Sequence, residues 1–121
     1  MNIYAFDVDH TLDCSGGPVP CAALLQLRRD GHIVGICGNF AVAFARAPEL
    51  VKVCNFFGQM EMSKAAFLRQ ISTYVQADKY VMVGNDRRYF GESMDVEAAR
   101  EAGWDFIREY DFASACKVVP Q

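Results

Sequence analysis

The sequence has few residues that bind metal through nitrogen or sulfur. Its 121 residues include only two histidines, and its five cysteines form no Cys-x-x-Cys pair. A structural zinc site needs about four such ligands at short spacing, so we do not expect one. The odd cysteine count, with no signal peptide at the start, favours a reducing cytoplasm over secretion. We expect Cys21, Cys37 and Cys54, which lie in apolar segments, to be reduced core residues.

Long hydrophobic runs and an excess of positive charge are also lacking. No apolar run approaches the roughly 18 residues that a membrane-spanning helix needs, so no membrane contact is expected. The net charge of −3 does not suggest a nucleic-acid binder, since such proteins are usually basic, but it leaves a local basic patch open. The hydrophobic fraction of 52% is enough for a real core, and the length fits one domain over residues 1–121.

Apolar runs of strand length alternate with segments of helical periodicity along the chain. Strands are expected at residues 2–6, 32–37, 51–57, 80–83 and 104–107, and helices at residues 21–30, 40–47, 62–76, 93–102 and 111–117. Strands that alternate with helices imply right-handed crossovers and a parallel sheet. We therefore predict an α/β fold of the three-layer, Rossmann-like kind, with a parallel sheet of about five strands.

Two of the expected helices have clear apolar sides. In residues 21–30 this side consists of Ala22, Leu24, Leu25 and Leu27. In residues 62–76 it consists of Ala66, Phe67, Ile71 and Tyr74, and Ser63 is the expected N-cap of that helix.

Polar turns follow three of the expected strands. Asp7 and Asp9 follow the first strand, Gly38-Asn39 follows the second, and Asn85-Asp86 follows the fourth. In extended chain, residues two apart point to the same face, so the first two carboxylates are presented together. Such a pair favours a bound cation or a shared proton, and ligands of parallel sheets bind outside the carboxyl ends of the strands. The plainer alternative is a strand that ends in an acidic turn.

Three segments resemble the haloacid dehalogenase-like superfamily, most of whose members are magnesium-dependent phosphatases. Residues 7–12 (Asp-Val-Asp-His-Thr-Leu) resemble the family's first motif, Asp-x-Asp-x-Thr-Leu. Residues 81–86 and the helix that follows, up to residue 104, resemble the fourth motif. Lys64, which opens a helix before that strand, fits the third motif. The resemblance runs from Asp7 to about Gly103.

This resemblance implies a role for each motif residue. Asp7 would be the nucleophile that forms an aspartyl-phosphate, and Asp9 would protonate the leaving group and then help to activate water. Lys64 would offset charge on the phosphoryl group, although a lone lysine at a helix start is ordinarily solvated surface. Asp7, the backbone carbonyl of Asp9 and Asp86 would bind Mg²⁺, which suits an all-oxygen site.

The sequence departs from the family pattern at two strand ends. Cys37 occupies the place of a Ser or Thr that binds phosphate, and a thiol is a weak donor. The amides of Gly38 and Asn39, or the Asn39 side chain, would have to replace it. The fourth motif reads Gly-Asn-Asp rather than Gly-Asp, which leaves open whether Asn85, Asp86 or Asp95 contacts the metal. We favour Asp86 because it keeps the negative charge.

The chain has no room for the cap domain that many members of the family carry. A site without a cap implies a large substrate, a partner subunit that closes the site, or an unselective enzyme. We predict magnesium-dependent hydrolysis of a phosphate monoester of unidentified structure, and leave the oligomeric state open. The alternative is a catalytically weak or inactive relative that binds a phosphorylated ligand or a protein. A phosphoacceptor domain like those of response regulators ranks lower, because Gly58-Gln59 after the third strand contains no acid.

Overall fold

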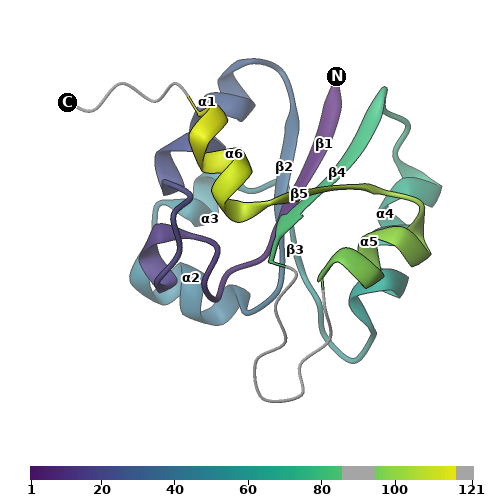
Figure 1. The fold of residues 1–121 in the computed structure, drawn as a ribbon, viewed down its shortest axis with the longest axis horizontal. Helices are drawn as coiled ribbons and strands as arrows, with labels where there is room; N and C mark the ends of the chain where they lie inside the picture. Colours follow the sequence, from purple (N-terminus) through teal and green to yellow (C-terminus); the bar gives the residue numbers. More distant parts are fainter. Residues whose placement is uncertain (86–94, 117–121) are drawn as a thin grey trace.

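A five-stranded, all-parallel sheet forms the middle layer of the computed structural model, which describes residues 1–85 and 95–116 (Figure 1). The strands are β1 (Asn2–Phe6), β2 (Ile33–Cys37), β3 (Phe56–Gly58), β4 (Lys79–Gly84) and β5 (Asp105–Arg108). Their order in the sheet is β3-β2-β1-β4-β5. The predicted α/β fold with a parallel sheet is confirmed.

Helices cover both faces of this sheet. On one face lie α1 (Cys21–Arg29), α2 (Phe40–Arg46), α3 (Leu50–Val53) and α6 (Glu109–Ala115), and on the other lie α4 (Lys64–Tyr74) and α5 (Asp95–Ala102) (Figure 1). A short 3₁₀ helix, η1 (Asp13–Ser15), follows β1. The described residues contain no second sheet that could form a cap, and none of their helices is long and apolar enough to cross a membrane.

The strand order places a topological switch at the centre of the sheet. The chain builds outward from β1 to β2 and β3, and α4 then carries it back to β4 on the other side of β1. Ala5 of β1 lies between Gly35 of β2 and Met82 of β4 in register. Crossovers leave the two central strands in opposite directions, which opens a crevice beyond their carboxyl ends. Asp7 and Asn85 follow these two strands.

The core has two parts, one on each face of the sheet. Because side chains alternate along a strand, Phe6 of β1 packs with Leu24 of α1 on one face, whereas Ala5 packs with Leu68 of α4 on the other. Both faces of β1 are therefore covered, as its nearly continuous apolar sequence predicts.

The strand predicted at residues 51–57 is largely wrong. Residues 50–53 form helix α3, and β3 begins only at Phe56. Leu50 and Val53, three residues apart, are both buried, while Val51 between them is exposed. That spacing is the one that places two side chains on the same face of a helix.

The helix predicted at residues 62–76 is shorter at both ends. It begins at Lys64. The side chain of Ser63, the preceding residue, accepts a hydrogen bond from the Ala66 N–H at 3.1 Å, so the predicted N-cap is confirmed. It ends at Tyr74, whose side chain is 81% exposed and does not belong to an apolar face as predicted. The other helices and strands lie within about two residues of their predicted bounds, and residues 93, 94 and 117 lie outside the described ranges.

Two adjacent leucines of α1 test this account of the core. Leu24 is fully buried, whereas Leu25, also predicted to face the core, is 37% exposed. We expect Leu24→Ala to lower the free energy of unfolding by about 2–5 kcal/mol, because it leaves a cavity in the core. Leu25→Ala, the matched control, should cost less than about 1 kcal/mol. Urea denaturation of both variants measures the difference, and equal losses would contradict the packing described.

Candidate active site

Asp7 lies at the carboxyl end of the central strand, just beyond Phe6. Its backbone N–H donates to the Val83 carbonyl at 2.9 Å, which extends the pairing of β1 with β4 by one residue. Its side chain is buried, and the Thr11 hydroxyl donates a hydrogen bond to Asp7 Oδ2 at 3.4 Å. A Cβ atom at Gly38 would lie 2.6 Å from Asp7 Oδ1, so any larger residue at the end of β2 would have to displace this carboxylate.

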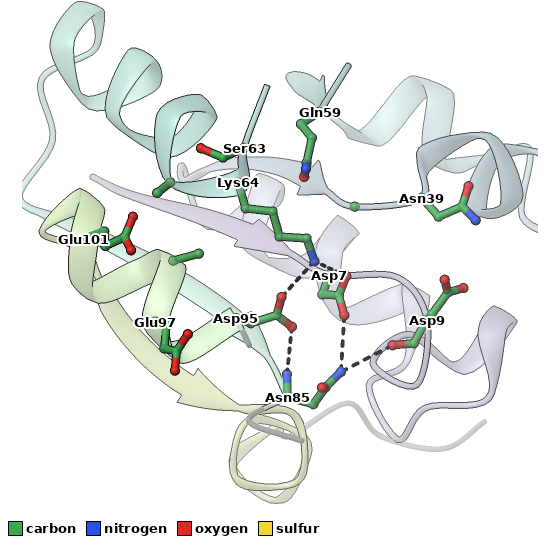
Figure 2. Close-up of a pocket in the computed structure, with 13 residues that line it drawn as sticks. Asp7, Asp9, Asn39, Gln59, Ser63, Lys64, Asn85, Asp95, Glu97 and Glu101 are labelled. Carbon is green, nitrogen blue, oxygen red and sulfur yellow. Dashed lines mark hydrogen bonds and ion pairs between the residues drawn. The ribbon is translucent and has the colours of Figure 1, made fainter. Parts of the chain in front are cut away.

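Lys64 contacts two carboxylates from different elements. As the first residue of α4, it extends toward the strand ends, where its Nζ donates to Asp7 Oδ1 at 2.9 Å and to Asp95 Oδ1 at 2.7 Å (Figure 2). Asp95, the first residue of α5, is only 2% exposed. The structure thus brings together Asp7 and Lys64, which the sequence motifs single out, and adds Asp95 as a third member.

Burial and the neighbouring charges shift the pKa values of Asp7 and Lys64. Loss of solvent raises the pKa of Asp7 to about 7; the neighbouring Lys64 opposes this shift and the Asp95 carboxylate adds to it. Burial also disfavours the Lys64 ammonium, but the attraction of Asp7 and Asp95 outweighs it and raises the lysine pKa above its usual range. Lys64 therefore stays charged at neutral pH, while Asp7 can gain or lose a proton there.

Asn85 connects the remaining polar groups at the strand ends. Its backbone N–H donates to Asp95 Oδ2 at 3.0 Å. Its side-chain Nδ2 lies 3.3 Å from Asp7 Oδ2 and 3.5 Å from the backbone carbonyl of Asp9 (Figure 2). A Cβ atom at Gly84 would lie 2.4 Å from Asp95 Oδ2, so the glycine before Asn85 permits this close arrangement.

The backbone carbonyl and the carboxylate of Asp9 point in different directions. Its backbone carbonyl faces Asn85, and its carboxylate points away from that contact (Figure 2). The hydroxyl of Ser15, at the end of η1, donates to Asp9 Oδ1 at 2.9 Å. The carboxylate and the carbonyl can therefore serve different purposes, one for proton transfer and one as a ligand.

The oxygens at the strand ends fit a hard cation such as Mg²⁺. Asp7 Oδ2 and the Asp9 carbonyl both lie within 3.5 Å of the Asn85 carboxamide nitrogen, so a turn of that carboxamide would bring a third oxygen to them. Asp86, the predicted ligand, lies outside the described residues. Within residues 1–85 and 95–116, no cluster of three or more His, Cys, Asp or Glu side chains is placed to hold a metal. The possible ligands among the described residues are all oxygen atoms, but only the Asp7 carboxylate carries a charge. Such a site would bind Mg²⁺ weakly and leave several of its water ligands in place.

The predicted phosphate-binding segment is placed less favourably. Cys37 is fully buried in the core on the α4 and α5 side of the sheet, and burial raises the pKa of its thiol to about 12. The Gly38 N–H already donates to the Gly58 carbonyl at 2.7 Å. Asn39 accepts from the Val42 N–H at 3.4 Å as the N-cap of α2. Gly38 and Asn39 border the cavity, and a phosphate-binding role for them or for Cys37 stays a prediction.

A cavity of about 600 Å³ lies in front of these groups. The polar and charged residues that line it are Asp7, Asp9, Asn39, Gln59, Ser63, Lys64, Asn85, Asp95, Glu97 and Glu101 (Figure 2). Glu97 and Glu101 form part of one wall on α5. The cavity is therefore large enough for a small phosphorylated compound, and its charged lining residues are all acidic except Lys64.

Sequence reasoning placed Asp7, Asp9 and Lys64 in the site, but it did not predict the contacts of Asp95 and Asn85. It left open whether either residue touches a metal, whereas the structure places Asp95 against Lys64 and Asn85 against Asp7. The signal for Asn85 was its position directly after a strand and Gly84. No protein-family profile, curated protein or solved structure matched the chain, so the resemblance to haloacid dehalogenase-like phosphatases remains an inference from the motifs.

Removing the Lys64 ammonium should leave two buried carboxylates without their shared cation. We expect Lys64→Met to lower the free energy of unfolding in EDTA by about 3 kcal/mol near pH 8. Lys64 lowers the pKa of Asp7, so its loss raises that pKa further above the unfolded value. A carboxyl of this kind takes up a proton on folding, and the destabilisation should therefore shrink as the pH falls toward about 5.5.

The matched control for this experiment is Lys79→Met, at an exposed position at the start of β4. It removes the same charge far from the carboxyl ends of the strands and should change stability little at either pH. Chemical denaturation at both pH values measures all three proteins. A loss that is equal for Lys64→Met and Lys79→Met, or independent of pH, would contradict the described ion pairs.

Proposed function

We propose that the protein is a magnesium-dependent phosphohydrolase that cleaves a phosphate monoester through an aspartyl-phosphate intermediate. The observation that carries the proposal is the buried Asp7 carboxylate at the end of the central strand, with Lys64 Nζ 2.9 Å from its Oδ1 and the cavity in front of it. The order of the motifs along the chain and the position of the cavity at the sheet's switch point also support it.

In the first step, an oxygen of Asp7 attacks phosphorus, and the bond between phosphorus and the leaving oxygen breaks. The Asp9 carboxyl donates a proton to that oxygen, so that an alcohol rather than an alkoxide departs. Lys64 keeps its charge and offsets negative charge on the reacting groups. A bound Mg²⁺ supplies further charge neutralisation on the phosphoryl oxygens.

In the second step, water attacks the phosphorus of the aspartyl-phosphate, and Asp9 now accepts a proton from it. The bond between Asp7 and phosphorus breaks, which releases inorganic phosphate and restores the carboxylate. The Ser15 hydroxyl, which donates to Asp9 Oδ1, holds the carboxyl in one orientation for both proton transfers. Asp9 serves as acid and then as base because the proton moves in opposite directions in the two steps.

Two observations favour the alternative function, a domain that binds a phosphorylated ligand or a protein and turns over slowly or not at all. Asn85 is neutral where the family motif carries an acid, and the polar donors expected at Cys37 and Gly38 are buried or already hydrogen-bonded. Both departures weaken the hold on a cation and a phosphoryl group. All five cysteines are free, which supports our proposal of a reducing, cytoplasmic setting.

Hydrolysis of an aryl phosphate with and without Mg²⁺ tests the proposed function. We expect metal-dependent turnover by the parent chain and a loss of about 10³-fold or more in Asp7→Asn, because the nucleophile is removed. Asp105→Asn, at the opposite end of the sheet, is the control and should keep full activity. A parent chain that binds Mg²⁺ but does not hydrolyse the ester favours the binding function, and turnover by Asp7→Asn contradicts the assigned nucleophile.

The role of Asp9 as general acid predicts a dependence on the leaving group. With an alkyl phosphate, whose leaving oxygen needs a proton, Asp9→Asn should lower kcat by about 10²–10⁴-fold. With p-nitrophenyl phosphate the first step should be much less affected, because nitrophenolate leaves without a proton. Pre-steady-state release of nitrophenol isolates that step from hydrolysis of the intermediate. Equal losses for both esters in the first step would assign Asp9 another role.

A further inference from the structure

The orientation of the Asn85 carboxamide follows from the atoms around it. Asp7 Oδ2 and the Asp9 carbonyl oxygen, at 3.3 and 3.5 Å from Nδ2, are both acceptors. If the carboxamide were reversed, Oδ1 would face these two acceptor oxygens in place of a donor. The amino group therefore donates to the same oxygens that would hold a cation.

The charge of the surroundings explains why a neutral side chain is tolerated here. Asn85 is only 7% exposed, and the buried carboxylates of Asp7 and Asp95 already share the single ammonium of Lys64. A carboxylate at position 85 would place a further negative charge against Asp7 Oδ2, which is costly at a buried site without a cation. The amino group of Asn85 instead supplies partial positive charge to that oxygen.

The backbone of Asn85 is held independently of its side chain. The N–H of Asn85 donates to Asp95 Oδ2 at 3.0 Å, and Asp95 is in turn fixed by Lys64 at 2.7 Å. Rotation of the carboxamide about its last side-chain bond exchanges Nδ2 for Oδ1 and requires no movement of the backbone. The same residue can thus present either a donor or an oxygen ligand to Asp7 and Asp9.

We propose that the Asn85 carboxamide acts as a stand-in for the cation when no Mg²⁺ is bound. Its Nδ2 donates to Asp7 Oδ2 and to the Asp9 carbonyl, and the carboxamide rotates to present Oδ1 to the cation when Mg²⁺ binds. This inference rests on the cation site of the proposed function and adds a regulation to it. Because binding must break two hydrogen bonds and gains a neutral ligand, Mg²⁺ affinity is lower than a carboxylate at this position would give. The site then responds to the Mg²⁺ concentration.

The Asn85 side-chain amide resonances provide a direct readout. We expect the ¹H–¹⁵N peaks of this group, assigned by through-bond experiments, to shift on titration with Mg²⁺ as the hydrogen bonds to Asp7 and Asp9 break. The side-chain peaks of Asn39, which borders the same cavity, are the internal control and should move much less. Asn85 peaks that stay in place up to tens of millimolar Mg²⁺ would overturn the proposal, because the cation would then bind without this group or not at all.

A pair of variants tests the expected effect on affinity. Asn85→Asp should bind Mg²⁺ about tenfold or more tightly, because it adds a negative charge at the ligand position. In EDTA its Tm should fall by about 5–10 °C, since the added carboxylate then faces Asp7 without a cation. Asn39→Asp adds the same charge in the same cavity and keeps a good N-cap for α2, so it should change both quantities little. Isothermal titration and thermal denaturation measure them, and equal affinities in the two variants would overturn the proposal.

The outcomes distinguish this inference from the proposed function. If the Asn85 peaks shift and Asn85→Asp binds Mg²⁺ more tightly while no ester is hydrolysed, the stand-in role holds and the phosphohydrolase proposal fails. If hydrolysis depends on Mg²⁺ but the Asn85 peaks do not move, the phosphohydrolase proposal holds and the stand-in role fails. The amide titration uses the unaltered chain, so it remains decisive even if Asn85→Asp does not fold in EDTA.

Discussion

The ammonium of Lys64 between Asp7 and Asp95 is the interaction on which the arrangement of the site depends. Its two contacts, at 2.9 and 2.7 Å, tie together the end of β1, the start of α4 and the start of α5. All three side chains are largely buried, so the loss of Lys64 leaves two carboxylates away from water without a cation. The need to pair these charges therefore fixes the two helix starts over the strand ends, and it shapes the wall of the cavity between them.

The fold could be predicted from the sequence wherever an apolar run has unambiguous ends. Residues 2–6 form a strand as predicted, because their nearly continuous apolar run is followed at once by polar Asp7 and suits a sheet covered on both faces. Residues 51–53 were misassigned because Val51, Lys52 and Val53 alternate as a strand does, although Leu50 and Val53 form one face of a helical turn. In so short a segment the two periodicities cannot be distinguished, and packing against the core decides between them.

The site was predictable in its positions but not in its contacts. Parallel strands bring their carboxyl ends to one edge of the sheet, so Asp7 and Asn85 were expected at the same edge, and the pairing of β1 with β4 in the structure makes them neighbours. The contact between Lys64 and Asp95 could not be predicted in this way. The two residues are 31 positions apart, and no local sequence pattern indicates which helix starts lie side by side. The direction of the Asn85 side chain depends on the backbone after Gly84, which a comparison of charges at residues 85 and 86 does not capture.

Of the two departures from the motifs that the sequence resembles, only Asn85 changes the charge at the strand ends. Cys37, whose thiol pKa is raised to about 12, is as neutral as the Ser or Thr whose place it takes, whereas Asn85 is a neutral amide where an acid would add charge to a region in which Asp7 and Asp95 already share one cation. Each additional buried carboxylate would make the site more dependent on a bound metal for its stability. With these neutral residues, Lys64 and the Asn85 amino group together satisfy both oxygens of Asp7 from within the chain. The geometry of the proposed nucleophile is therefore set by the fold, and a cation that binds there acts on a carboxylate that is already in position.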